Sequence, residues 1–325
     1  MTVFVVAMCS AVVLTGLLIP VLRRAGWLDV PNSRSSHSVP TPKAGGLAVL
    51  AAVVLGVAVS GEAGAWPLLV PALLLGLVGL TDDLKQLSPA TRLVAQVLAA
   101  TGLVLWVAAE YGSDGLWAPL FAVIGVLGLV AYVNAFNFMD GIDTISSLNG
   151  AVAGAWFVWI GHDHGLPVVV VVGAALGGAA LGFLPWNAGS RVFLGDVGSY
   201  GMGALAAGAA VVAWAAGVPG LVAVAPLLIY LADTGSVLAR RAMAGESLTA
   251  PHRTHVYQRL VQSGWRQLAS AAWSASLAGL LCVVVATLYD DTPAGAVVIV
   301  GLLITVYLLS PRLVNNRHRP DAVAS

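Results

Sequence analysis

The chain has 325 residues, of which 59% are hydrophobic and only 9% are charged. Soluble globular domains carry roughly 25% charged residues. This composition therefore excludes a water-soluble protein, which could not cover its surface with so few charges. The formal net charge is zero and gives no reason to expect nucleic acid as a partner.

Apolar segments long enough for membrane helices recur along the whole chain. A helix needs about 20 apolar residues to cross the hydrocarbon layer, and about 17 can suffice. In chain order the segments are Val3–Leu22, Ala44–Ser60, Trp66–Leu80, Leu93–Ala109, Trp117–Met139, Ser146–Ile160, Pro167–Trp186, Gly198–Ala216, Gly220–Asp233, Leu268–Leu288 and Ala294–Leu309. The sequence predicts an all-α polytopic membrane protein of about eleven transmembrane helices, with residues 1–325 forming a single integral membrane domain.

The basic residues predict the orientation, because cytoplasmic loops are enriched in Lys and Arg. With the N-terminus outside, all 15 Lys and Arg residues fall in inside loops or in the C-terminal tail. The outside loops then contain acids and histidines but neither Lys nor Arg. A wrong number of spans would break this partition, so it supports a cytoplasmic C-terminus as well as the count.

Unusual polar residues gather at the inside ends of the predicted helices. The first group is Ser36–Gly46, where a Pro-rich turn brings Lys43 to the start of the second span. Backbone N–H groups at a helix N-terminus, beside a lysine, suit phosphate oxygens. A basic loop before a span is, however, also an ordinary topological signal.

The second group is the adjacent pair Asp82 and Asp83, at the end of the third span. Neighbouring residues of a helix point about 100° apart, so the two acids need not share one ligand. A solvated helix end is the alternative, but the macrodipole disfavours acids at a helix C-terminus. Metal binding or phosphate activation is the functional interpretation.

The third group combines two amides and two acids at spacings of three residues: Asn134, Asn137, Asp140 and Asp143. If the helix continues through them, this spacing places a polar stripe on one face. A capped helix end would need one such residue rather than four. The stripe therefore predicts a functional surface.

The fourth group is Asp196, which lies between glycines at the start of the eighth span. Its carboxylate could cap the helix. The alternative is a ligand for Mg²⁺, which takes one or two carboxylates and leaves room for substrate phosphates.

The fifth group lies in the longest inside loop and contains His252, Arg253, His255 and Arg259. Two histidines three residues apart could bind a transition metal. With arginines between and after them an anion is the better ligand, because Arg matches phosphate oxygens bidentately. The five groups together describe phosphoryl transfer with a nucleotide-linked substrate.

In this order the groups resemble the polyprenyl-phosphate N-acetylhexosamine-1-phosphate transferase family, also called glycosyltransferase family 4, and the resemblance covers nearly all of the chain. His37–Gly46 is similar to the first loop of the family, Asp82-Asp83 to its aspartate pair, Asn134–Asp143 to its Asn…Asp-Gly-x-Asp segment, Leu194–Ser199 to its Gly-Asp-x-Gly-Ser element, and His252–Leu260 to the His-rich loop of its O-antigen and teichoic-acid initiating branch.

The resemblance implies transfer of a sugar-1-phosphate from a UDP-N-acetylhexosamine to undecaprenyl phosphate, with release of UMP. It implies Mg²⁺ as cofactor, with Mn²⁺ as an alternative, and an active site facing the cytoplasm at a bacterial inner membrane. Asp196 and Asp83 would hold the metal, and Asp82 and Asp83 would act at the phosphates, as a base, an orienting group or a covalent nucleophile. The substrate contacts would be Lys43, Asn134, Asn137, Asp140, Asp143, His252, Arg253 and His255.

The chain departs from the family pattern at two places, and the first of them bears on the substrate. The loop from His252 to His255 lacks the triple histidine typical of the peptidoglycan lipid I branch, which favours an initiator of surface polysaccharide. Ala44 stands where the first loop often has another glycine. The run Phe138-Met139-Asp140 most resembles enzymes that accept UDP-GlcNAc or a 6-deoxy relative.

Two alternatives for the function remain at this stage. The chain could be a phospho-N-acetylmuramoyl-pentapeptide transferase, which makes lipid I. It could be a secondary transporter, although transporters place polar residues near the bilayer midplane. Small residues such as Gly173, Gly177 and Gly178 allow close helix contacts, either within the chain or between two copies in a homodimer.

Overall fold

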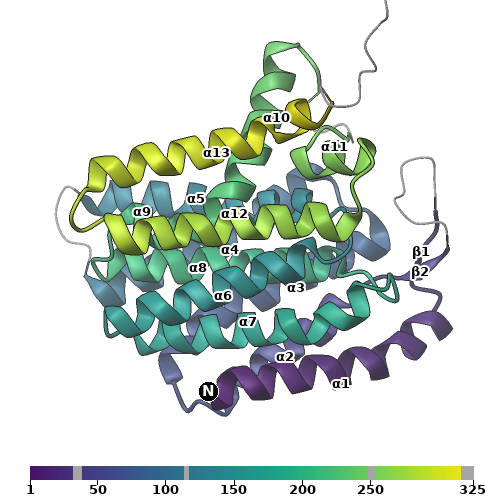
Figure 1. The fold of residues 1–325 in the computed structure, drawn as a ribbon. Coiled ribbons are helices and arrows are strands. Elements are labelled where there is room, and N and C mark those ends of the chain that lie inside the picture. The colour runs from purple at the N-terminus through teal and green to yellow at the C-terminus, as the bar shows by residue number, and fades with distance from the viewer. Residues whose placement is uncertain (32–38, 113–116, 248–252, 316–325) are drawn as a thin grey trace, which may run out of the picture.

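The computed structural model describes residues 1–31, 39–112, 117–247 and 253–315. Most of these residues belong to helices, and the long helices lie side by side with their axes roughly aligned (Figure 1). Among the described residues the only strands are β1 (Leu28–Asp29) and β2 (Thr41–Pro42), which pair antiparallel. The all-α prediction is confirmed.

In chain order the α-helices and 3-10 helices (η) are α1 (Thr2–Arg24), α2 (Gly46–Ala58), η1 (Ala63–Ala65), α3 (Trp66–Lys85), α4 (Pro89–Tyr111), α5 (Trp117–Met139), α6 (Ile145–Asp163), α7 (Pro167–Asn187), α8 (Gly195–Ala215), α9 (Gly220–Val224), η2 (Ala225–Leu227), α10 (Leu228–Met243), α11 (Val256–Gln262), α12 (Gln267–Leu288) and α13 (Pro293–Asn315). Each apolar segment of the sequence falls on one of these helices, with α9, η2 and α10 together forming the ninth. The short α11 is additional and lies in the longest loop.

Nine helical segments of the described residues are long and apolar enough to span a membrane. Two predicted spans are not among them. The α2 helix has only 13 residues, and α6 has 19 but begins with the polar Ser146, Ser147 and Asn149. Both pack inside the bundle, α2 against α1 and α7, and α6 against α7 and α12. The chain is a multi-pass membrane protein.

The ends of α4 follow from local sequence. Ser88 precedes the helix and accepts a hydrogen bond from the Thr91 N–H at 3.1 Å, and Pro89 fits the first turn, where its missing N–H is not needed. At the other end Gly112 adopts φ 68°, a left-handed conformation that costs glycine little.

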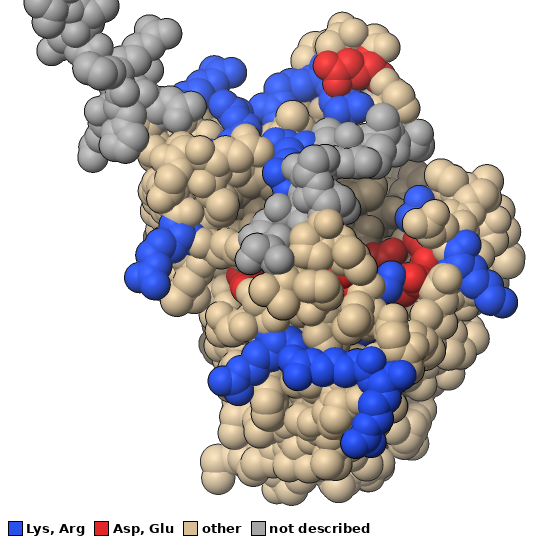
Figure 2. Space-filling view, turned by 90° about the vertical axis from the view of Figure 1, so that its right-hand side faces the viewer, with Lys and Arg blue, Asp and Glu red and all other residues tan. Residues whose placement is uncertain are grey.

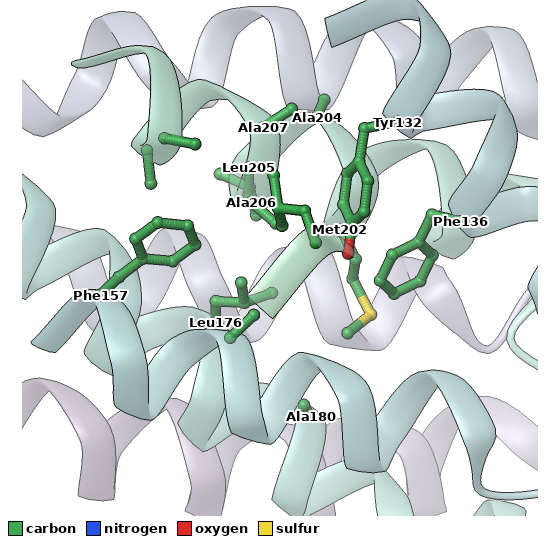
Figure 3. Close-up of a cluster of buried hydrophobic side chains, with 14 of the residues drawn as sticks. Tyr132, Phe136, Phe157, Leu176, Ala180, Met202, Ala204, Leu205, Ala206 and Ala207 are labelled. Atoms are coloured by element: carbon green, nitrogen blue, oxygen red, sulfur yellow. The ribbon is translucent and has the colours of Figure 1, made fainter. Parts of the chain in front are cut away.

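The centre of the bundle is α8, in which 94% of the residues of the most apolar stretch are buried. Its side chains are mostly small, which lets neighbouring helices approach closely. In Figure 3, Met202 and Ala204–Ala207 of α8 lie among Tyr132 and Phe136 of α5, Phe157 of α6 and Leu176 of α7. The core is therefore formed by large side chains of the surrounding helices that pack against the small side chains of α8.

The glycines of α7 serve contacts within the chain. A Cβ atom at Gly173 would lie 2.8 Å from the carbonyl oxygen of Gly154 on α6, and one at Gly178 would lie 2.4 Å from that of Phe4 on α1. A Cβ at Gly177 would lie 3.4 Å from the Gly154 Cα. These residues thus give no support to a homodimer.

Outer helices present apolar side chains to the surroundings. On α4 the residues Leu93, Val94, Leu98 and Leu105 are all at least half exposed. A continuous apolar face of this kind is rare on a soluble monomer and is what a lipid-facing helix requires.

Candidate active site

Segments far apart in the sequence meet at one end of the bundle. They are the loop before α2, the end of α3, the start of α4, the turn between α5 and α6, and the start of α8. Acidic side chains lie in the middle of this face, with Lys and Arg side chains around them (Figure 2). The polar groups expected to share one face are thus together in space.

Asp83 connects α3 to α8. Its Oδ2 accepts hydrogen bonds from the backbone N–H groups of Asp196 at 2.9 Å and Val197 at 3.4 Å. The first N–H groups of a helix have no partner inside it, and negative charge is favoured there. The sequence offered Asp196 as the cap of its own helix. Instead, α8 has no side-chain cap of its own, and Asp83 supplies one from α3.

Two glycines permit this contact. A Cβ atom at Gly79 on α3 would lie 2.2 Å from the carbonyl oxygen of Asp196, so the two backbones touch at this point and a side chain cannot fit. Gly195 adopts φ 73°, a conformation that other residues reach only with strain. Together Gly79 and Gly195 place Asp196 directly against the end of α3.

Lys43 binds the end of the same helix. Its Nζ donates to the backbone carbonyl of Asp83 at 2.6 Å and lies 3.9 Å from Asp83 Oδ1. A cation is favoured among the unpaired carbonyl groups at a helix C-terminus. The Lys43 side chain is 27% exposed, so its ammonium group stays within reach of a ligand at the surface.

Asn137 orients Asp196. Its Nδ2 donates to Asp196 Oδ1 at 2.7 Å and to Ser199 Oγ at 2.9 Å. The amide thus holds the carboxylate from α5 while Asp83 holds the neighbouring backbone from α3. The predicted amide and the predicted metal ligand are in direct contact.

Asp82 forms an ion pair with Arg92, which in the sequence served only to predict the orientation in the membrane. Its Oδ2 accepts from Arg92 Nη1 at 2.8 Å, and its Oδ1 accepts from the Leu87 N–H at 2.7 Å. The Asp82 side chain is 7% exposed, and Tyr200 of α8 lies beside Arg92. Both carboxylate oxygens of Asp82 are therefore engaged, whereas Asp83 faces Lys43 and α8.

The turn between α5 and α6 carries the other two acids. The α5 helix ends at Met139, so the helical stripe considered from the sequence stops before Asp140 and Asp143. Asp140 Oδ1 accepts from Ser146 Oγ at 2.6 Å, and Asp143 Oδ2 accepts from Ser190 Oγ. Desolvation raises the pKa of the Asp140 carboxyl well above its ordinary value, and the nearby Asp196, Asp83 and Asp143 act in the same direction.

Backbone strain surrounds this cluster. In the described part of the chain the non-glycine residues with positive φ are Ala44 (75°), Gln86 (53°), Thr144 (72°) and Ser190 (50°). Each lies next to Lys43, at the end of α3, or in contact with Asp143. Such conformations cost about 1–3 kcal/mol each and cluster at functional sites.

Asn134 makes its hydrogen bonds to α4 and to its own helix, not to the acids of the cluster. Its Nδ2 donates to Gln96 Oε1 at 2.6 Å and to the Val130 carbonyl at 2.8 Å, and Gln96 Nε2 lies 3.4 Å from Asn134 Oδ1. Gln96 is 1% exposed on α4. The amide predicted to touch substrate thus pairs with another amide between α4 and α5.

His255 is almost fully buried, at 3% exposure, and its Nδ1 lies 3.1 Å from Asp233 Oδ1. Asp233 was missed as a functional candidate, although an acid at the end of an apolar segment was an available signal. Arg253 is half-buried, and its carbonyl accepts from Gln262 Nε2 at 3.2 Å. His252 lies outside the described residues.

The acids of the described residues do not form a complete metal site on their own. Within the described residues, no group of three His, Cys, Asp or Glu side chains is placed to hold one metal ion. The carboxylates of Asp82, Asp83 and Asp196 are nonetheless close enough to interact electrostatically. The arrangement suits an anionic ligand that binds together with a cation, because the acids would hold the cation and the part-exposed Lys43 would hold the anion.

Comparison with known proteins bears on the chemistry of this face. The family model described as glycosyl transferase family 4 matches residues 65–214, which span the helices from α3 to α8. A decaprenyl-phosphate N-acetylglucosaminephosphotransferase of Mycolicibacterium smegmatis is 27% identical, over 92% of this chain and 84% of that protein. A probable undecaprenyl-phosphate N-acetylglucosaminyl 1-phosphate transferase of Bacillus subtilis is 25% identical, over 80% and 77%.

A phospho-N-acetylmuramoyl-pentapeptide-transferase of Synechococcus sp. is 31% identical, over 80% of this chain and 83% of that protein. This similarity extends over most of both chains and includes the helices that carry the acidic cluster. Together with the family match over that region, it shows that the chain belongs to glycosyl transferase family 4.

Proposed function

We propose that the protein transfers an N-acetylhexosamine-1-phosphate from a UDP-sugar to undecaprenyl phosphate and releases UMP. The observation that carries the proposal is the contact of Asp83, Lys43, Asn137 and Asp196 at one end of a membrane bundle. Relatives named as polyprenyl-phosphate N-acetylglucosamine phosphotransferases support the same reaction. UDP-GlcNAc, or a 6-deoxy relative, is the proposed donor.

In the proposed reaction an oxygen of the lipid phosphate attacks the phosphorus that carries the sugar. The bond between this phosphorus and the oxygen that bridges to UMP breaks, and UMP leaves with the electron pair. Lys43 is suited to hold the diphosphate, because its ammonium group is part-exposed beside the acids. Both oxygens of Asp82 already accept hydrogen bonds, one of them from Arg92. Asp82 is therefore suited to act indirectly, by holding Arg92 in position to orient a phosphate group.

The donor set of the site fits Mg²⁺, with Mn²⁺ as an alternative. Mg²⁺ commonly uses one or two carboxylates and completes its shell with water and substrate phosphates, and Asp83 and Asp196 supply such a pair. When bound, the ion would neutralise the diphosphate and the departing UMP. Asn137 would fix the direction of the Asp196 carboxylate during this step.

The proposed setting is a bacterial inner membrane, with the acidic face towards the cytoplasm. The distribution of Lys and Arg supports it, since these residues gather on the face that carries the acids (Figure 2). A donor made in the cytoplasm would then reach the site from water, and the lipid phosphate from the bilayer. The product would initiate a cell-surface polysaccharide of the O-antigen or teichoic-acid kind.

Lipid I synthesis is a second candidate, because the Synechococcus sp. relative is named for that reaction. Purified protein should be incubated with undecaprenyl phosphate, Mg²⁺ and either UDP-GlcNAc, a 6-deoxy relative or UDP-MurNAc-pentapeptide. We expect UMP release with the first two donors, dependent on both lipid and Mg²⁺ and absent in Asp196→Asn. Release only with UDP-MurNAc-pentapeptide would favour lipid I synthesis, and silence of folded protein with every donor would contradict the proposal.

A further inference from the structure

The loop after α10 contacts the acidic turn through a side chain that the proposed reaction does not use. Tyr257, in the first turn of α11, is fully buried. Its hydroxyl donates to the carbonyl oxygen of Phe138 at 3.1 Å. Phe138 lies two residues before Asp140, at the point where α5 ends. Tyr257 therefore binds the end of α5, directly before the turn that carries Asp140 and Asp143, here called the acidic turn.

The same hydroxyl lies against the turn itself. A Cβ atom at Gly141 would lie 2.1 Å from the Tyr257 hydroxyl oxygen and 3.1 Å from the ring carbon that bears it. Real Cβ atoms do not approach other atoms as closely as 2.1 Å. The turn can pass over Tyr257 only because glycine follows Asp140.

A buried acid holds α11 in place. Asp233 of α10 is fully buried and accepts hydrogen bonds from the Val256 N–H at 3.0 and 3.2 Å and from the Tyr307 hydroxyl at 2.8 Å. His255 Nδ1 lies 3.1 Å from the same carboxylate. A buried carboxylate is tolerated when several donors surround it. Asp233 thus fixes the start of α11 to α10 and α13.

Tyr257 is held in place by a ring contact with His255 and by a hydrogen bond to its backbone carbonyl. The rings of His255 and Tyr257 are stacked, with centroids 5.8 Å apart. The Tyr257 carbonyl accepts from Ser270 Oγ on α12 at 3.0 Å. On the other side of the turn, Gln267 Oε1 of α12 accepts from the Asp143 N–H at 2.8 Å. The acidic turn is therefore held by the α11 and α12 segments.

We infer that Tyr257 and Asp233 are positioning residues: Asp233 fixes α11, and Tyr257 fixes the turn that carries Asp140 and Asp143. Both side chains are fully buried, so they act through the turn and not by touching a substrate. The inference rests on the proposed function only for the consequence of moving the turn. Displacing a reacting group by about 1 Å can lower a rate by roughly 100-fold.

Tyr257→Phe removes the hydroxyl and keeps the ring. We expect kcat to fall about 10-fold, because Asp140 and Asp143 lose their position while the aromatic ring stays in place. The matched control is Tyr132→Phe, which removes an equally buried hydroxyl, bonded to Asn149 Oδ1 at 3.2 Å within the bundle. Its kcat should stay near that of the wild type. Equal kinetic effects in the two variants, or wild-type kcat in Tyr257→Phe, would overturn the inference.

A suppressor test addresses the contact directly. Gly141→Ala should lose most activity, because its Cβ meets the Tyr257 hydroxyl. The double variant Gly141→Ala/Tyr257→Phe should recover part of the loss, since the contact at 2.1 Å is gone and the nearest ring carbon lies at 3.1 Å. A double variant no more active than Gly141→Ala would contradict a role of this contact.

Hydrogen–deuterium exchange gives a readout that needs no donor. In Tyr257→Phe and in Asp233→Asn, amides of residues 138–146 should exchange at least about 10-fold faster than in the wild type, because the turn opens more easily. Tyr132→Phe should leave them unchanged. If wild-type protein transfers no sugar phosphate, the proposed function fails while this comparison still decides the positioning role. Unchanged exchange in both variants would overturn it.

Discussion

The carboxylate of Asp83, in the last turn of α3, accepts the backbone N–H of Asp196 at 2.9 Å, and so joins the end of one helix to the start of another. Lys43 approaches the same residue from the loop before α2. The acid thus has two separable properties. Its oxygens hold the start of α8, and its negative charge lies beside the Lys43 ammonium group.

Asp83→Asn separates these properties. The amide oxygen can still accept the Asp196 N–H, so the start of α8 should be retained and the melting temperature should change little. Loss of the charge should lower turnover roughly 100-fold, comparable with removal of one electrostatic group from a transition state. Turnover and thermal unfolding in detergent measure the two effects. Near-normal turnover in a folded Asp83→Asn protein would remove Asp83 from the proposed chemistry.

Gly79→Ala should disrupt the site from a distance. The added Cβ would meet the Asp196 carbonyl oxygen at 2.2 Å, which forces α3 and α8 apart and carries Asp196 away from Asp83. We expect turnover to fall at least about 10-fold together with the melting temperature. Gly102→Ala on α4 is the control, because its Cβ would have no neighbour within 4 Å and alanine favours a helix by about 1 kcal/mol. If both variants behave alike, the close approach of the helices is not needed.

Asn137→Ala tests whether this amide serves the metal or the nucleotide. Asn137 donates to Asp196 Oδ1 at 2.7 Å, and loss of such a supporting bond typically costs about 10–100-fold in metal affinity. We expect the Mg²⁺ concentration for half-maximal activity to rise about 10-fold while KM for the UDP-sugar stays unchanged. Kinetic titration at several Mg²⁺ concentrations separates the two. A rise confined to the donor KM would indicate a substrate contact instead.

The sequence predicts the helices, and much of the cluster, for one physical reason. In lipid, backbone groups must be satisfied within the helix, so apolar segments correspond directly to helices such as α3 and α8. Polar residues beside such segments are costly unless they serve a site. Asp82, Asp83 and Asp196 stand out on that ground, and the structure places them together.

How polar residues pair is less accessible from the sequence, because it depends on which helices are neighbours. Arg92 was counted only for orientation, yet it neutralises Asp82. Asp233 was assigned to the end of a span, yet it anchors α11. Asn134 and Asn137 lie only about 60° apart around a helix, but α5 lies between α4 and α8, so each amide faces a different neighbour.

Arg92→Gln should destabilise the protein. It removes the cation from Asp82, a carboxylate that is 7% exposed. Breaking a buried ion pair costs about 3–5 kcal/mol. Because Arg92 is 31% exposed, we expect about 2 kcal/mol here. Adding Asp82→Asn should restore much of the stability, since the uncompensated charge is gone, but not the turnover. Equal melting temperatures for the single and double variants would contradict the pairing.

Replacing Gln96 and Asn134 by leucine tests whether Asn134 contacts substrate or only α4. Each single variant leaves one amide without its partner between two membrane helices, which should cost about 1–2 kcal/mol. The double variant Gln96→Leu/Asn134→Leu removes both amides, so its melting temperature should return towards that of the wild type. Its turnover should also be retained, because Asn134 bonds to Gln96 and to its own helix and not to an acid of the cluster. A double variant that is stable but inactive would instead show that Asn134 serves the substrate, since packing between α4 and α5 would then be intact.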